Sequence, residues 1–128
     1  MEQVCVGVDI GGTSVKLGIF TLSGTLLKKW EIPTEPKNEP KALIEKIGKS
    51  IKENLKEGGL SLTDCVGVGM GVPGPVMPNG YIEVVVNIGW KEIFPARILS
   101  DLLDGMPVAL GNDANVAALG EAWMGGAK

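Results

Sequence analysis

The chain has 128 residues, a net charge of −3 and 45% hydrophobic residues, which suits one folded domain with a proper core. Its hydrophobic content excludes an intrinsically disordered chain, and its dispersed basic residues form no nucleic-acid footprint. The sequence contains no histidine, which excludes His-based triads and His-containing metal sites within this chain.

The chain opens on a strand pattern rather than on a basic segment followed by a long apolar one, so we expect no secretory signal. No apolar run reaches membrane-spanning length, and a cytoplasmic location with no membrane partner is the resulting expectation. Cys5 and Cys65 both lie in apolar runs. In that compartment we expect them to be buried free thiols rather than a disulfide.

The first predicted element is a β-hairpin over residues 4–20. Two apolar runs meet at Gly11 and Gly12, and adjacent glycines between strand-like runs are typical of a hairpin turn. Glycine has no Cβ and tolerates positive φ, so the turn amides can approach an anion, with the Thr13 hydroxyl as a further donor. Asp9 at the strand end can orient a hydrated Mg²⁺. The pattern predicts a phosphate-binding hairpin; the glycines alone favour a plain turn without a ligand.

Residues 25–33 are expected to add a third strand and complete an antiparallel meander. Residues 41–57 have the clearest helical periodicity, because apolar residues recur on one face at Leu43, Ile44, Ile47, Ile51 and Leu55. Asn38 is the predicted N-cap, with Pro40 in the first turn, and a glycine pair at 58–59 ends the helix. We interpret this helix as a structural crossover with a solvated outer face.

Residues 65–72 are apolar and glycine-rich, which favours a central strand parallel to the first. The strand leads into a rigid loop at Gly71–Pro75, at the sheet edge where ligands of open α/β sheets lie. A stiff turn without a ligand is the alternative. Further along, we expect a strand over residues 81–87, a short helix over residues 95–103 and a last strand over residues 107–110.

The last strand runs into Asn112 and Asp113, and a helix of small residues is expected over residues 116–123. Asp113 is placed to cap that helix. The same carboxylate, next to an amide at a strand's carboxyl end, can also accept a proton from a substrate hydroxyl. The residues alone leave both interpretations open.

Three stretches together resemble a known family. The stretch Asp9–Lys16, DIGGTSVK, resembles the first phosphate motif of the sugar-kinase, Hsp70 and actin superfamily. Residues 67–76, GVGMGVPGPV, resemble the loop that lines the sugar site in the ROK family of bacterial glucokinases, sugar kinases and repressors. Residues 112–121 match the N-D-x-N-x-A-x-x-G-E segment of ROK kinases, and Asn87–Trp90 is similar to their N-L-x-W segment.

The resemblance implies an α/β fold with a mixed five-stranded sheet, an antiparallel meander extended by parallel strands, and helices on both faces. This is a ribonuclease H-like, or actin-like, ATPase lobe. Residues 1–124 correspond to the N-terminal lobe of a two-lobed sugar kinase, and residues 125–128 to the start of the hinge. The C-terminal lobe, with the family's zinc site and second phosphate loop, is not matched by this chain, so we expect a truncated domain.

By resemblance, the function is ATP-dependent phosphorylation of a hexose, glucose above others, at its 6-hydroxyl. The residues that would hold ATP phosphates and Mg²⁺ are Asp9, Gly11, Gly12 and Thr13, with Lys16 a weaker candidate. Those that would bind sugar are Gly74, Asn87, Asn112 and Asp113, and Asp113 would be the catalytic base. We expect the chain alone to turn over poorly. The alternatives are a non-catalytic lobe that binds a partner or self-associates, and a fragment of a ROK repressor; the latter is disfavoured because no helix-turn-helix precedes Asp9.

Overall fold

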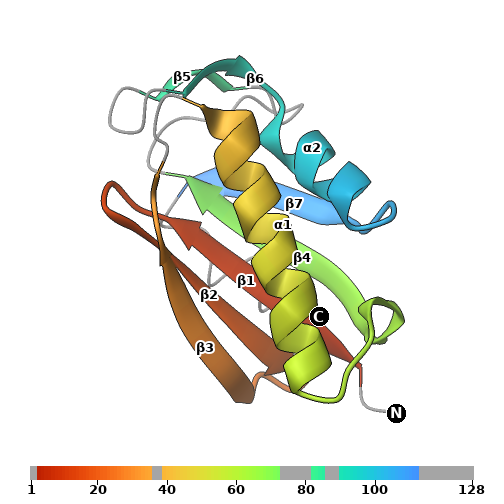
Figure 1. Ribbon diagram of the computed structural model, residues 1–128. Helices are drawn as coiled ribbons and strands as arrows, with labels where there is room; N and C mark the ends of the chain where they lie inside the picture. Colours follow the sequence, from red (N-terminus) through yellow and green to blue (C-terminus); the bar gives the residue numbers. More distant parts are fainter. Residues whose placement is uncertain (1–2, 36–38, 73–81, 86–89, 113–128) are drawn as a thin grey trace.

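The computed structural model describes residues 3–35, 39–72, 82–85 and 90–112, in which a five-stranded sheet is covered by two helices (Figure 1). The sheet has the strand order β3-β2-β1-β4-β7. Its strands are β1 (Val4–Ile10), β2 (Ser14–Thr21), β3 (Leu26–Pro33), β4 (Cys65–Val72) and β7 (Val108–Asn112). The helices are α1 (Pro40–Glu57) and α2 (Pro95–Leu102), with a 3₁₀ turn at Leu62–Asp64 before β4.

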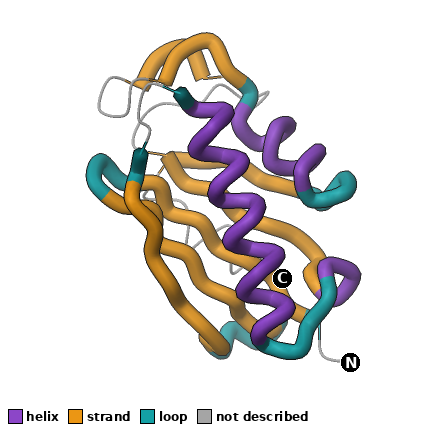
Figure 2. Tube along the Cα trace, in the orientation of Figure 1, coloured by secondary structure: helices purple, strands orange, loops and turns teal. Residues whose placement is uncertain are grey.

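The strand directions confirm the predicted mixed sheet. β1, β2 and β3 pair in antiparallel fashion, β4 runs parallel to β1, and β7 runs parallel to β4. The parallel pair β1–β4 requires a crossover, and α1 supplies it (Figure 2). The main strands begin or end within two residues of the predicted bounds, so apolar runs and turn residues were sufficient to locate them.

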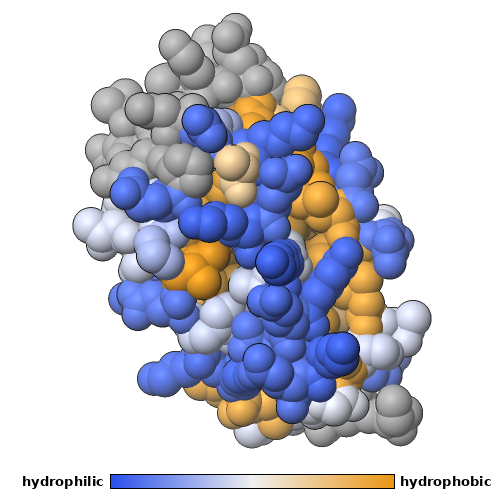
Figure 3. All heavy atoms as spheres, viewed as in Figure 1, coloured by the Kyte–Doolittle hydropathy of each residue, from blue (hydrophilic) through white to orange (hydrophobic). Residues whose placement is uncertain are grey.

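Alternate residues of the central strands form the core. Side chains of one face of β1, β2 and β4 are buried against the apolar face of α1. The strand residues of this core are Val4, Val6, Val8, Ile10, Val15, Leu17, Ile19, Cys65, Val68, Met70 and Val72. The helix contributes Leu43, Ile44, Ile47, Ile51 and Leu55, all at most 1% exposed. The outer face of α1 is hydrophilic (Figure 3), as expected for a structural crossover.

Part of the opposite face of the sheet is built from residues with little or no side chain. Gly7 of β1 lies beside Gly18 of β2 and Gly69 of β4, and Gly69 lies beside Ala109 of β7. A Cβ built at Gly18 would come within 3.0 Å of the Phe20 ring. The glycines of β1 and β2 therefore leave room for this aromatic side chain.

Both described helices cover the same face of the sheet (Figure 1). They pack closely at Gly48 of α1, where an added Cβ would lie 3.4 Å from Leu102 and 3.5 Å from Leu99 of α2. The helix expected over residues 116–123 lies outside the described residues, so a helix on the second face stays a prediction.

The two ends of α1 differ in how well the sequence predicted them. Gly58 ends the helix and its N–H donates to the carbonyls of Asn54 and Leu55, as expected. The N-cap prediction is wrong: the helix begins at Pro40, so the capping position falls on Glu39, which makes no side-chain capping bond. Proline at the first helical position lacks the N–H that a cap would otherwise satisfy.

The strand expected over residues 81–87 is confirmed at Ile82–Val85, and the structure adds a second strand that pairs with it. β5 (Ile82–Val85) pairs antiparallel with β6 (Trp90–Ile93), with Val85 opposite Trp90. β6 was not predicted from the sequence, because the stretch around Trp90 was interpreted as a motif rather than as a strand. This hairpin is not part of the five-stranded sheet.

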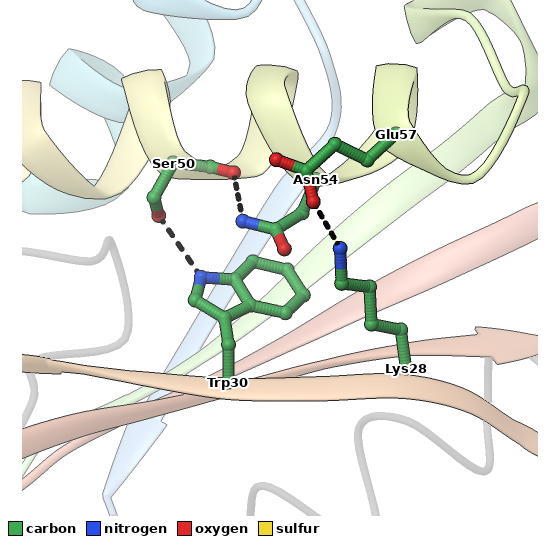
Figure 4. A network of polar contacts seen from close by, with 5 residues as sticks. All are labelled: Lys28, Trp30, Ser50, Asn54 and Glu57. Carbon is green, nitrogen blue, oxygen red and sulfur yellow. Dashed lines mark hydrogen bonds and ion pairs between the residues drawn. The ribbon is translucent and has the colours of Figure 1, made fainter.

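The edge strand β3 is attached to α1 by polar contacts (Figure 4). The indole Nε1 of Trp30 donates to Ser50 Oγ at 3.3 Å, and Ser50 Oγ donates to the carbonyl of Ile47. Lys28 and Glu57 form an ion pair of 2.7 Å, but Glu57 is 67% exposed, and such surface pairs add little stability. The half-buried indole is therefore the main polar link between strand and helix.

Both cysteines are buried free thiols, as predicted. Burial raises the pKa of the Cys5 thiol to about 11, with Cys65 adding to the shift. Burial also raises the pKa of Cys65, partly offset by hydrogen bonding with the Gly67 backbone. Neither thiol is therefore a reactive thiolate at neutral pH. Among the described residues, neither helix is long and apolar enough to cross a membrane.

Candidate functional site

The parallel strands β1, β4 and β7 present their carboxyl ends along one edge of the sheet (Figure 1). Asp9 of β1 is in register with Gly71 of β4, and Gly71 with Gly111 of β7. Asn112 is paired with Val72 at the end of the same row. Since strands lie about 4.8 Å apart, Asp9 and Gly111 are about 10 Å from each other across the sheet. The backbone therefore brings the first and last predicted motifs to one edge.

Asp9 is the polar residue near the end of an otherwise apolar strand. Its Oδ1 is buried and has no hydrogen-bond partner among the described residues. Lys16 lies directly opposite Asp9 in the β1–β2 register, but its side chain is exposed and forms no ion pair with Asp9. A buried carboxylate oxygen without a partner is costly. The arrangement leaves this oxygen free to bind a cation.

The turn between β1 and β2 confirms the predicted hairpin. The N–H of Gly11 donates to the carbonyl of Ser14 at 2.9 Å, while Gly12 and Thr13 are exposed. The tolerance of glycine for positive φ is not used here, since neither Gly11 nor Gly12 adopts it. Gly11 is required for space instead, because a Cβ there would lie 2.9 Å from the Ser14 carbonyl oxygen. A Cβ at Gly12 would meet no described atom within 4 Å.

Thr34, which was not predicted from the sequence, is hydrogen-bonded to this turn on its buried side. It is fully buried, its Oγ1 donates to the carbonyl of Gly11 at 2.8 Å, and its N–H donates to the carbonyl of Thr13 at 3.1 Å. A threonine directly after a strand has no pattern of its own, so the sequence contained no signal for this contact.

The structure places only part of the predicted sugar site. Asn112 is described as the last residue of β7, and Gly74, Asn87 and Asp113 lie outside the described residues. The described part of the site is therefore the Asp9 carboxylate, the turn at residues 11–13 and the strand ends beside them.

The described residues of the site suit Mg²⁺ better than a metal that needs several protein side chains as ligands. The described part of the chain contains no group of three or more His, Cys, Asp or Glu side chains that could surround an ion. Mg²⁺ typically binds through one or two carboxylates and completes its shell with water and substrate phosphates. A single unpartnered oxygen of Asp9 beside exposed turn amides fits that pattern.

Comparison with known proteins gives a consistent picture. The sequence profile of the ROK family matches residues 5–128. A glucokinase from Halalkalibacterium halodurans is 40% identical over 121 residues, which are 94% of this chain and 36% of that protein. The crystal structure of a ROK family glucokinase from Streptomyces griseus in complex with glucose and AMPPNP is 28% identical, with a TM-score of 0.73 over 98% of this chain and 38% of that one.

Regulators are also among the similar proteins. A putative xylose repressor from Caldicellulosiruptor sp. is 27% identical over 122 residues, 94% of this chain and 30% of the repressor. The chain thus spans about a third of the length of the curated relatives that it matches. The matching part is common to kinases and repressors.

The two turn glycines are expected to respond differently to alanine. Gly11→Ala should lower the free energy of unfolding by about 1–3 kcal/mol, because its Cβ would press on the Ser14 carbonyl. Gly12→Ala should change it by less than about 1 kcal/mol, because the position is open. Urea denaturation of both variants measures the difference, and equal losses would contradict the geometry described for Gly11.

Proposed function

Because the chain belongs to the ROK family, we propose that it forms the N-terminal lobe of a two-lobed, ATP-dependent hexose kinase. The proposed reaction transfers the γ-phosphate of ATP to the 6-hydroxyl of the sugar, with glucose as the favoured substrate. The observation that carries the proposal is the unpartnered buried oxygen of Asp9, which lies beside an exposed glycine turn at the carboxyl edge of the sheet. The glucose and AMPPNP in the Streptomyces griseus structure support the choice of ligands.

The phosphate side of the site comes from the hairpin. Gly12 and Thr13 are exposed, and backbone N–H groups in such a turn are the kind of donors that cradle an anion. Asp9 would hold Mg²⁺, which neutralises the charge that develops on the transferring phosphoryl group. Lys16 is exposed on the same face as Asp9 and would act as a weaker, mobile partner of the phosphates.

The sugar side of the site would come from the loops after β4 and β7. We assign sugar binding to Gly74, Asn87 and Asn112, and the role of base to Asp113, on the basis of the family motifs. β7 ends at Asn112 beside Val72 of β4, so Asp113 directly follows the strand edge that also carries Asp9. A carboxylate there would accept the hydroxyl proton during an in-line transfer.

Residues 1–124 would form this lobe and residues 125–128 the start of a hinge. A second lobe would close over the site and exclude water from the phosphoryl transfer, and the family's zinc site would belong to that lobe. Without it the reactants are not held together, so the chain by itself would be nearly inactive.

The second candidate function is the sensor lobe of a sugar-responsive repressor, which the similarity to the Caldicellulosiruptor repressor favours. A repressor needs to bind sugar but has no need of Mg·ATP. Dependence of nucleotide binding on Asp9 therefore separates the two functions.

Asp9→Asn is expected to weaken binding of Mg·ATP to the chain by about tenfold or more, because a charged ligand of the ion is lost. The free energy of unfolding should stay equal or rise, because an unpartnered buried charge is removed. Calorimetric titration with Mg·ATP, repeated with EDTA, measures the first effect. Asp101→Asn, which changes an exposed carboxylate on α2, is the matched control and should bind normally. Equal binding by the wild type and Asp9→Asn would remove Asp9 from the metal site.

Asp113→Asn tests the base in a two-lobed protein, made by replacing the matching 36% of the Halalkalibacterium halodurans glucokinase with this chain. Asparagine caps a helix as well as aspartate does, so the melting temperature and glucose binding should be retained. Loss of the proton acceptor should lower the turnover number by about 10²–10⁴-fold. A turnover number within a few-fold of the unsubstituted chimera would mean that Asp113 is only a cap.

A further inference from the structure

We propose that Thr34 is a positioning residue that fixes the orientation of the phosphate-binding turn, an inference that rests on the kinase function proposed above. Thr34 directly follows β3 and reaches across to the turn between β1 and β2. It is one of three polar or charged residues that are buried in the described part of the chain, and it is fully inaccessible.

Two hydrogen bonds from this one residue bracket the turn. The hydroxyl of Thr34 donates to the carbonyl of Gly11, and its backbone N–H donates to the carbonyl of Thr13, at 2.8 Å and 3.1 Å. The bonded carbonyls belong to the peptides on either side of the Gly12–Thr13 peptide. The side chain and the backbone N–H of Thr34 thus hold the peptide groups on both sides of the Gly12–Thr13 peptide.

The first of these bonds determines where the N–H of Gly12 points. A trans peptide is planar and carries its oxygen and its N–H on opposite sides. Because the Gly11 oxygen points to Thr34, the Gly12 N–H points away from Thr34. Gly12 is exposed, and its N–H has no hydrogen-bond partner among the described residues. The Thr34 hydroxyl therefore presents this amide to a ligand.

The turn needs such a restraint because its own residues supply little. Gly12 has open space around it, and a glycine loses more conformational freedom on ordering than any other residue. If the Gly11–Gly12 peptide rotated, a carbonyl oxygen would face the phosphates in place of an N–H. The hydroxyl of Thr34 raises the population of the binding-competent orientation, and ligand affinity scales with that population.

Thr34 is itself held in place from both sides. It continues the β2–β3 ladder beyond Ser14–Pro33, and the next carbonyl, that of Glu35, accepts a hydrogen bond from Lys46 of α1 at 3.2 Å. Thr34 and the residue after it are therefore hydrogen-bonded both to the sheet and to the crossover helix α1.

The chain offers a matched control at the other end of β2. Thr21 is also buried, its Oγ1 accepts a hydrogen bond from the N–H of Thr25 at 3.0 Å, and it contacts the Ser23 hydroxyl. Thr21→Val thus removes a threonine hydroxyl from a hairpin turn, as Thr34→Val does, but at the opposite edge of the sheet. The two variants should lose similar stability, about 0.5–2 kcal/mol each.

The experiment measures urea denaturation and calorimetric Mg·ATP binding on the 128-residue chain. Thr34→Val is expected to weaken Mg·ATP binding about tenfold and to speed hydrogen exchange at the Gly11 amide, whose N–H donates to the Ser14 carbonyl within the turn. Thr34→Ser, which keeps the hydroxyl, should restore both to near the wild-type values. Thr21→Val should bind Mg·ATP normally. Thr34→Cys, whose thiol is a weak donor, provides the same test with an intermediate loss if Thr34→Val does not fold.

The outcomes separate the two proposals. Normal binding by Thr34→Val, or an equal loss in Thr21→Val, would overturn the role of Thr34 and leave the kinase function standing. Failure of Thr34→Ser to restore binding would also overturn it. Absence of Mg·ATP binding by the folded wild-type chain would instead contradict the phosphate-binding turn itself, and the role of Thr34 would fall with it.

Discussion

The parallel pairing of β1 with β4 is the constraint on which the rest of the structure depends. Parallel neighbours cannot be joined by a tight turn, so the chain must cross over, and α1 makes the crossing while its apolar face completes the core. The same pairing sets Asp9 beside Gly71, which in turn lies beside Gly111 of β7. The register between β1 and β4 therefore determines both how the core forms and which residues meet at the candidate site.

At the edge of that sheet, stability and binding make opposite demands. The core side chains Val8 and Met70 are completely buried, and Trp30 of the edge strand donates a hydrogen bond to Ser50 of α1. Asp9, the residue after Val8, has a buried oxygen without a hydrogen-bond partner among the described residues. Local rules of folding are typically broken where a site is functional. The hairpin tip is restrained by Thr34 from the buried side, which leaves its outer side open for a ligand.

The sequence predicted the fold well because its signals were local and periodic. The glycine pair at 11–12 and the four-residue repeat of α1 identified the hairpin and the crossover, and the run before Val72 gave β4 its bounds. Contacts between distant segments were not predictable, since Thr34 is 23 residues from Gly11 in the chain. β6 was missed because the stretch around Trp90 was interpreted as a motif rather than as a strand. Asp9 was predicted from its motif, but only the structure shows that its Oδ1 is buried and has no hydrogen-bond partner among the described residues.

The central claim is that the carboxyl edge at β1 and the following turn bind nucleotide phosphates. The most direct measurement is residue-resolved NMR titration of the wild-type ¹⁵N-labelled chain with Mg·ATP. The account predicts shift changes concentrated at residues 9–13 and at Gly71 and Val72, with the turn at Leu22–Gly24 and the 3₁₀ turn at Leu62–Asp64 unaffected. Changes centred on those opposite-edge turns, or no saturable change at residues 9–13, would contradict it.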